Sequence, residues 1–206
     1  MIRPRAVLFD LLTGLLDSWS LWDRVAGDGD GRRWRAAYLR NTYATAIYRP
    51  YEGLVREAAV EVGLPASLAD RLIERYGELA PWPEVAAVLG ALEGQIPLAV
   101  VTNCSEVLAQ VAVARTGIGF AAVVSAERAG FYKPHPRPYR LALEALGATP
   151  ETSLFVAGSA YDLYGASAAG MPVYWHDRIG MAAPPDAPAP IARHDSLFPL
   201  RQIALG

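Results

Sequence analysis

The stretch AVLFD, residues 6–10, decides the fold, because four apolar residues in a row end on a single carboxylate. A short, wholly apolar run is typical of a strand buried on both faces, as in a parallel sheet. Open α/β sheets hold their reacting groups beyond the carboxyl ends of such strands. Asp10 stands at that position, and the next ionisable residue is Asp17. A lone carboxylate there suits covalent attack better than metal binding.

Four later segments share this pattern of a short apolar run that ends in small or polar residues, namely 96–103, 121–125, 153–159 and 171–176. Between them lie stretches with helical period, at 105–114 after a plausible N-cap at Ser105, and at 138–146 before a helix stop at Gly147. Alternation of strand and helix predicts an α/β fold with a parallel sheet covered on both faces.

Residues 17–82 differ in character, since they are rich in Arg, Tyr, Trp and Glu and contain no convincing strand. Helical stretches are expected near 34–48, 51–62 and 67–79. We therefore predict a helical cap at 17–82, inserted after the first strand, and a core formed by 1–16 and 83–206. A cap in this position would cover the mouth of the site as a lid. The Pro- and Ala-rich segment 182–190 predicts an irregular surface connection, and the apolar stretch from Ile191 is expected to pack back on the core.

Composition excludes several classes of function. The 206 residues are 52% hydrophobic, which is enough for a sizeable core. A net charge of -2 without a long like-charged block indicates neither nucleic-acid nor anionic-membrane binding, so a small-molecule substrate is expected. No segment resembles a signal peptide or a membrane span. The single cysteine, Cys104, favours a reducing compartment, and we expect a cytoplasmic protein.

If the strand ends meet, they bring together Asp10, Thr102, Asn103, Lys133 and the segment 159–162. A carboxylate, a hydroxyl and amide pair, a lysine and a second carboxylate suit substitution through an ester intermediate. Each residue alone also has a structural explanation. Asp, Asn, Ser and Thr often cap helices and turns, and a lysine is often an ordinary surface charge.

Four ordered motifs favour the chemical interpretation: FDLLTGLLDSW (9–19), VVTNCS (100–105), YKPHPRPY (132–139) and FVAGSAYDLYGASAAGMPVYW (155–175). Together they resemble the haloacid dehalogenase-like hydrolase superfamily, and within it the L-2-haloacid dehalogenase branch. The resemblance implies a Rossmann-like core with a small helical cap after the first strand.

The same resemblance implies catalytic roles. Asp10 would be the nucleophile that forms an aspartyl ester, and Lys133 would offset carboxylate charge and orient it. Asp162 would help organise Lys133 and the hydrolytic water. Thr102 and Asn103 would hold the anionic group of the substrate.

Substrate-binding and cap residues follow in the same way. Tyr139 matches a tyrosine of the dehalogenase branch, and Arg35 matches the cap arginine that draws off a departing halide. A solvated position on an amphipathic helix is an equal alternative for Arg35. Leu12, Leu39 and Tyr161 could wall an apolar pocket, although buried leucine is more often plain core. Ser159 could still form a hydrogen bond in the fourth motif.

Two positions distinguish a phosphatase from a carbon-centred hydrolase. The related phosphatases carry a second aspartate at the position of Leu12 and a magnesium-binding aspartate at the position of Gly158. Without them the site is a poor magnesium cage, and Leu12 cannot protonate a leaving alcohol. The sequence also departs from the dehalogenases, because Thr13-Gly14 is reversed and Ala157 and Ser159 replace a serine and an asparagine.

The preferred hypothesis is a hydrolase that needs no cofactor or metal and displaces a leaving group from C2 of a small carboxylic acid through an ester on Asp10. Opening of a strained ring such as azetidine-2-carboxylate is a variant of this reaction. One alternative is a magnesium-dependent phosphatase, with Asp10 and Asp162 as metal ligands. Another is a catalytically silent binding protein. The resemblance leaves a homodimer open.

Overall fold

A computed structural model describes residues 3–27 and 29–206 of the chain. Six parallel strands form one sheet in the order β3-β2-β1-β4-β5-β6. Their bounds are β1 Ala6–Phe9, β2 Leu98–Thr102, β3 Ala122–Ser125, β4 Ser153–Ala157, β5 Val173–His176 and β6 Ala192–His194. The predicted α/β fold and five predicted strands are confirmed. The sixth strand, β6, was not predicted, because this edge strand, Ala-Arg-His, is largely exposed and lacks an apolar run.

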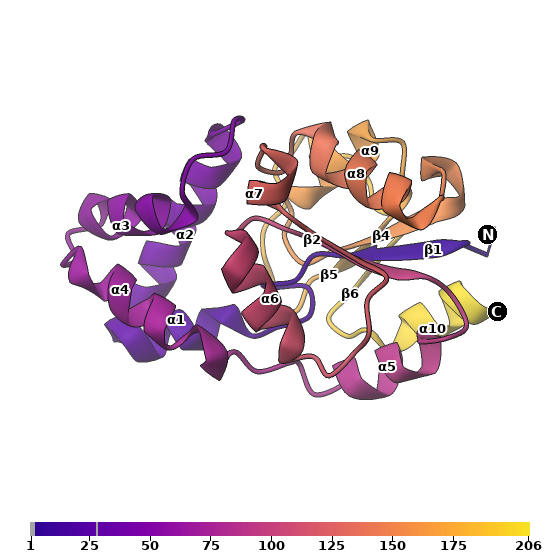
Figure 1. Ribbon diagram of the computed structural model, residues 1–206, viewed down its shortest axis with the longest axis horizontal. Helices are drawn as coiled ribbons and strands as arrows, with labels where there is room; N and C mark the ends of the chain where they lie inside the picture. The colour runs from indigo at the N-terminus through magenta and orange to yellow at the C-terminus, as the bar shows by residue number, and fades with distance from the viewer. Residues whose placement is uncertain (1–2, 28) are drawn as a thin grey trace.

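Helices cover both faces of the sheet (Figure 1). One face carries α5 Val85–Leu92, α6 Glu106–Ala114 and α10 Phe198–Leu205, and the other carries α8 Pro136–Leu146 and α9 Asp162–Ala168. Alternation along β1 supplies both cores, since Val7 and Phe9 join one cluster while Ala6 and Leu8 join the other. Every residue of β1 is fully buried, which explains its uninterrupted apolar sequence.

Four helices lie beyond the carboxyl ends of the strands, at the left of Figure 1. They are α1 Ser18–Ala26, α2 Asp30–Ala44, α3 Tyr51–Glu61 and α4 Ser67–Glu74. Tilted aromatic pairs join α1 to α2, with the centroid of Trp22 4.4 Å from that of Trp34 and 5.4 Å from that of Tyr38. A cap at 17–82 remains our prediction of the domain division. Helix α1 was not predicted.

Short elements complete the chain: α7 Ala126–Ala129 and the 3-10 helices η1 Tyr76–Glu78 and η2 Pro150–Thr152. Gly147 ends α8 in the left-handed conformation, with φ 60°, so that predicted stop is confirmed. Ser105 takes the N-cap position of α6 as predicted, although its side chain makes no capping hydrogen bond. Its hydroxyl instead donates to Glu52 across 2.8 Å.

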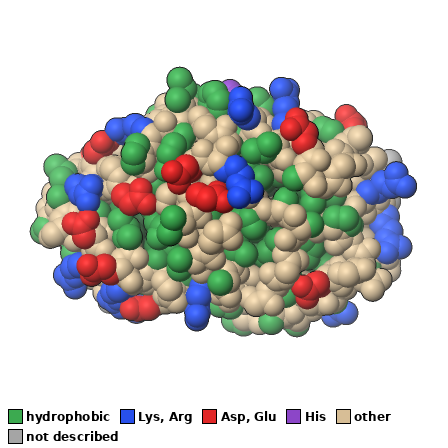
Figure 2. Space-filling model, in the orientation of Figure 1, with side chains coloured by type: hydrophobic (Ala, Val, Ile, Leu, Met, Phe, Trp, Pro, Cys, Tyr) green, Lys and Arg blue, Asp and Glu red, His purple; other side chains and the backbone are tan. Residues whose placement is uncertain are grey.

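Acidic and basic side chains are interspersed on the face in Figure 2, without a large patch of one sign. In the described part of the chain, no helix is long and apolar enough to cross a membrane.

Candidate active site

The turn after β1, residues 10–14, wraps around the carboxylate of Asp10. The backbone N–H groups of Thr13 and Gly14 donate to its Oδ2 across 3.3 and 3.0 Å. Position 14 requires glycine, because a Cβ there would lie 2.3 Å from the carbonyl oxygen of Asp10. We call residues 10–14 the nucleophile loop.

Lys133 lies between two carboxylates, and its Nζ is 2.8 Å from Oδ1 of Asp10 and 2.8 Å from Oδ1 of Asp162. The side chain of Asn103 clamps the lysine backbone, accepting from its N–H at 2.7 Å and donating to its carbonyl at 3.1 Å. Lys133 is also the only lysine among the 19 basic residues of the chain. The ends of β1 and β2, the start of α9 and the turn before α8 therefore converge on one charge cluster.

The two carboxyl groups have opposite pKa shifts. Burial opposes the ionisation of Asp10, but the Lys133 charge and the loop amides outweigh it and lower the pKa below 3.8. Burial and the charge of Asp10 raise the pKa of Asp162 above 3.8, despite the nearby lysine. Burial also opposes the charge on Lys133, yet the two carboxylates raise its pKa. Asp10 is therefore the carboxyl group that stays ionised to lower pH, and Asp162 is the one that binds a proton more readily.

A small cavity of about 20 Å³ adjoins Asp10, which is room for about one water molecule. Its lining comprises Asp10, Leu12, Thr13, Arg35, Tyr38, Leu39, Tyr43, Asn103, Lys133 and Ser159. Seven of these lining residues were predicted as site residues: Asp10, Leu12, Arg35, Leu39, Asn103, Lys133 and Ser159.

Arg35 is buried in the cavity wall, with only 1% of its surface exposed. Its Nη2 donates to Thr13 Oγ1 across 3.1 Å, while Nε and Nη1 have no hydrogen-bond partner. The guanidinium lies 5.1 and 5.4 Å from the ring centroids of Trp19 and Trp22. Within residues 3–27 and 29–206, no carboxylate forms an ion pair with it. A desolvated guanidinium with free donors is suited to bind a small anion.

Four predicted residues lie outside the cavity lining, and their proposed roles remain predictions. Asp162 reaches Asp10 only through Lys133. The Thr102 hydroxyl lies 3.7 Å from Cys104 Sγ. Tyr161 stacks on Tyr43 with centroids 4.7 Å apart, and the hydroxyl of Tyr139 is buried without a partner.

Tyr38 and Tyr43 also line the cavity and were not predicted as site residues. The Tyr38 hydroxyl donates to the carbonyl of Asn103 across 2.5 Å, and the Tyr43 hydroxyl donates to Asp162 Oδ1 across 2.9 Å. Helical spacing from Arg35 could have found both, since positions 35, 38, 39 and 43 follow one face of α2. Thr13, whose order with Gly14 is reversed relative to the dehalogenases, also has a role at the site. Its hydroxyl accepts a hydrogen bond from Arg35 and makes none to Asp10.

Magnesium does not fit the residues present. A Cβ at Gly158 would lie 2.1 Å from the Gly14 nitrogen and 2.6 Å from Asp10 Oδ2, so no carboxylate side chain can occupy that position. No group of three or more His, Cys, Asp or Glu side chains in the described ranges could hold a metal ion. Asp10 and Asp162 instead share a lysine, which repels a cation.

Comparisons with known proteins agree on one family. A family model for haloacid dehalogenase-like hydrolases matches residues 5–170. An (S)-2-haloacid dehalogenase from Xanthobacter autotrophicus is 32% identical over 87% of this chain and 77% of its own length. Haloacetate dehalogenase H-2 from Moraxella sp. (strain B) is 30% identical over 88% of this chain and 89% of its own.

A solved structure extends the likeness to the whole fold. The L-2-haloacid dehalogenase from Xanthobacter autotrophicus, with chloropropionic acid covalently bound, superposes with a TM-score of 0.84 at 28% identity. The match covers 100% of this chain and 99% of that one.

Proposed function

The chain belongs to the haloacid dehalogenase-like hydrolase family, and we propose that it removes the halide from C2 of a small 2-haloacid. In this proposal Asp10 forms an ester with the substrate, which water then hydrolyses. The observation that carries the proposal is the juxtaposition of Asp10 with Arg35 across one small cavity. The first supplies a nucleophile whose pKa is held low, and the second a buried cation with free donors.

In the first step an oxygen of Asp10 attacks C2 while the carbon–halogen bond breaks. We assign the attack to Oδ1, which accepts one hydrogen bond, from Lys133, whereas Oδ2 accepts two, from backbone amides. The halide leaves with the bonding electron pair and needs no proton, so a permanently charged arginine suffices to receive it. Leu12 and Leu39 exclude water from the reacting carbon.

In the second step water adds to Cγ of the Asp10 ester. The amides of Thr13 and Gly14 face the oxygen on which negative charge develops, an arrangement that stabilises such an intermediate. The Oδ2 atom of Asp162 is buried without a hydrogen-bond partner and has a raised pKa, which suits it to accept the proton of the water. On collapse the bond between Cγ and Oδ1 breaks, the departing oxygen takes the proton held by Asp162, and a 2-hydroxy acid is released with Asp10 and Asp162 both regenerated as carboxylates. Because water attacks the ester carbonyl, the configuration at C2 is inverted overall.

A single turnover in oxygen-18 water tests the mechanism. With enzyme in excess over (S)-2-chloropropionate, we expect chloride release, unlabelled (R)-lactate and one heavy oxygen in the peptide that contains Asp10. Label in the lactate hydroxyl would contradict an ester on Asp10. The Asp10→Asn variant is the control, because its amide cannot act as the nucleophile.

The role of Arg35 has a test of its own. Arg35→Met should slow ester formation by about a hundredfold or more, since it removes charge stabilisation of the departing halide. Competitive inhibition by bromide should also weaken. Arg40→Met is the matched control, because Arg40 is an exposed residue of the same helix that pairs with Glu61. Equal bromide inhibition in both variants would place the halide elsewhere.

The alternatives are tested by the same preparation. Gly158 disfavours the phosphatase, which would release phosphate from phosphate esters on addition of magnesium. A silent binding protein would turn over neither class of substrate. The proposal also includes catalysis without a cofactor and a cytoplasmic location. It further includes a homodimer, which analytical sedimentation would measure.

A further inference from the structure

Two side chains outside the cavity lining bind the carbonyl groups of the nucleophile loop. Trp82 Nε1 donates to the carbonyl of Thr13 across 2.8 Å. His176 Nδ1, at the end of β5, lies 2.8 Å from the carbonyl of Gly14. A carbonyl only accepts hydrogen bonds, so Nδ1 carries the hydrogen. The loop thus accepts from Trp82 and His176 and donates to Asp10.

One peptide group links Trp82 to the nucleophile. Its carbonyl belongs to Thr13 and accepts from Trp82, while its N–H belongs to Gly14 and donates to Asp10 Oδ2. Hydrogen bonds in such a chain polarise one another, so the first strengthens the second. His176 fixes the following peptide and thereby the orientation of Gly14, which has no side chain of its own to pack.

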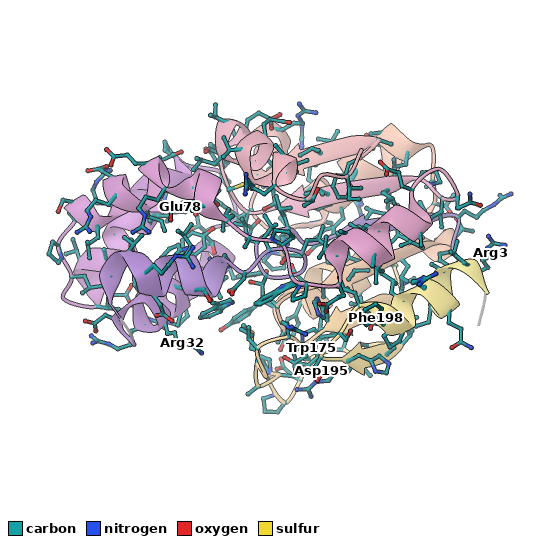
Figure 3. All side chains as sticks on the ribbon, turned by 90° about the horizontal axis from the view of Figure 1, so that it is seen from below. Arg3, Arg32, Glu78, Trp175, Asp195 and Phe198 are labelled. Atoms are coloured by element: carbon teal, nitrogen blue, oxygen red, sulfur yellow. The ribbon has the colours of Figure 1, made fainter. Side chains whose placement is uncertain are left out.

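Behind His176 lies Glu84, at the N-terminus of α5 and 4% exposed, and the imidazole Nε2 makes no hydrogen bond to it. The Nε2 atom of the fully buried imidazole is 3.4 Å from Glu84 Oε1. Arg178 Nη1 lies 3.5 Å from the same oxygen, and its guanidinium is 5.2 Å from the ring centroid of Trp82. Figure 3 labels Trp175, the residue that precedes His176 in β5.

We propose that His176, assisted by Trp82, is a positioning residue that holds Gly14 with its N–H directed at Asp10. The inference rests on the proposed attack by Asp10, but the contacts that support it are independent of the substrate. Trp82 and His176, which are distant in sequence from each other and from residues 13–14, meet at the nucleophile loop. Their contacts stabilise the geometry required for attack and for the charge on Oδ2.

The first test compares His176→Leu with His194→Leu, since His194 is an exposed residue of the adjacent strand. His176→Leu should lower kcat for 2-chloropropionate by about tenfold or more, with KM changed by less than about twofold. His176→Asn should recover most of the loss, because its amide N–H replaces Nδ1–H. His194→Leu should match the wild type. An unchanged kcat in His176→Leu, or no recovery in His176→Asn, would overturn the proposal.

The second test does not depend on turnover. In protein labelled with nitrogen-15 glycine, the amide proton of Gly14 should resonate downfield because it donates to a carboxylate. His176→Leu and Trp82→Phe should both move this resonance upfield, while His194→Leu leaves it in place. If every haloacid is inert but the resonance moves, the proposed function fails and the positioning role stands. A Gly14 resonance unmoved in both variants would refute the positioning role. If His176→Leu does not fold, the shift of the Gly14 resonance in Trp82→Phe still tests the proposal.

Discussion

The hydroxyl of Tyr43, in α2, donates a 2.9 Å hydrogen bond to Asp162, the first residue of α9. This contact joins the helices beyond the sheet to the charge cluster, because the same oxygen of Asp162 also receives Lys133. Tyr43 therefore completes a chain from α2 through Asp162 and Lys133 to the nucleophile.

Tyr43→Phe should slow hydrolysis of the ester by about tenfold and leave its formation nearly unchanged, because the hydrogen bond acts on Asp162. The hydrogen bond lowers the pKa of Asp162, so its loss should raise that pKa and move the acid limb of hydrolysis to higher pH. Rapid-quench kinetics separate the two steps. Tyr164→Phe is the control, since it removes an exposed Tyr-to-Asp hydrogen bond of 2.7 Å to Asp186. Equal effects on both steps would contradict this assignment.

The opposite pKa shifts of the two carboxyl groups predict separate acid limits for the two steps. Ester formation needs ionised Asp10, whose pKa is below 3.8, and ester hydrolysis needs ionised Asp162, whose pKa is above 3.8. As the pH falls towards 4, hydrolysis should slow first and the covalent intermediate should accumulate. Mass spectrometry of acid-quenched protein measures it. Coincident limits, with no accumulation at any pH, would show that Asp162 does not act on the water.

Lys133 is expected to determine stability as well as chemistry. Lys133→Met leaves two buried carboxylates without their cation, and should cost about 3–5 kcal/mol in the free energy of unfolding at pH 7. The folded pKa of both groups would then lie above the unfolded value. In this variant Asp10 and Asp162 would therefore favour the folded state when the pH is below their unfolded pKa, and this contribution to stability would be lost as the pH rises through their folded pKa. Wild-type Asp10 has a lowered pKa and does the reverse, adding stability above 3.8 that is lost on acidification.

The loss in the free energy of unfolding caused by Lys133→Met should therefore be smaller at pH 5 than at pH 7. Urea unfolding at the two pH values measures it. Arg56→Met is the control, because Arg56 pairs with Asp70 on the surface and such pairs contribute about 0–1 kcal/mol. A deficit that stays constant with pH would mean that the carboxylates are not the source of the loss.

Local sequence was sufficient for five of the six strands and for the charge cluster of Asp10, Lys133 and Asp162. Buried parallel strands read as apolar runs, so β1 could be found from five residues, with Asp10 at its end. Lys133 and Asp162 could be placed because strand ends in a parallel sheet converge. The first helix, α1, was predictable in principle, since Asp17 accepts from the Ser20 N–H as an N-cap.

The remaining contacts had no local signal. His176 reaches Gly14 across 162 positions and Trp82 reaches Thr13 across 69, and no periodicity relates such residues. The partner of the Thr13 hydroxyl depended on how α2 lies over the loop, so the reversed Thr13-Gly14 pair gave no hint that the threonine binds Arg35. Packing, and not pattern, determines these contacts.

Gly158 provides a steric test of the site. A Cβ at this position would overlap Gly14 and the carboxylate of Asp10, at 2.1 and 2.6 Å, and neither neighbour can move without breaking the loop hydrogen bonds. Gly158→Ala should therefore abolish halide release, and Gly158→Asp should not create magnesium-dependent phosphate release. Gly53→Ala, in α3, is the matched control, because a Cβ there meets nothing within 4 Å. That control should keep full activity and gain up to about 1 kcal/mol of stability. Activity in Gly158→Ala would show that the loop has room to move, and would weaken the steric argument against a metal-binding aspartate.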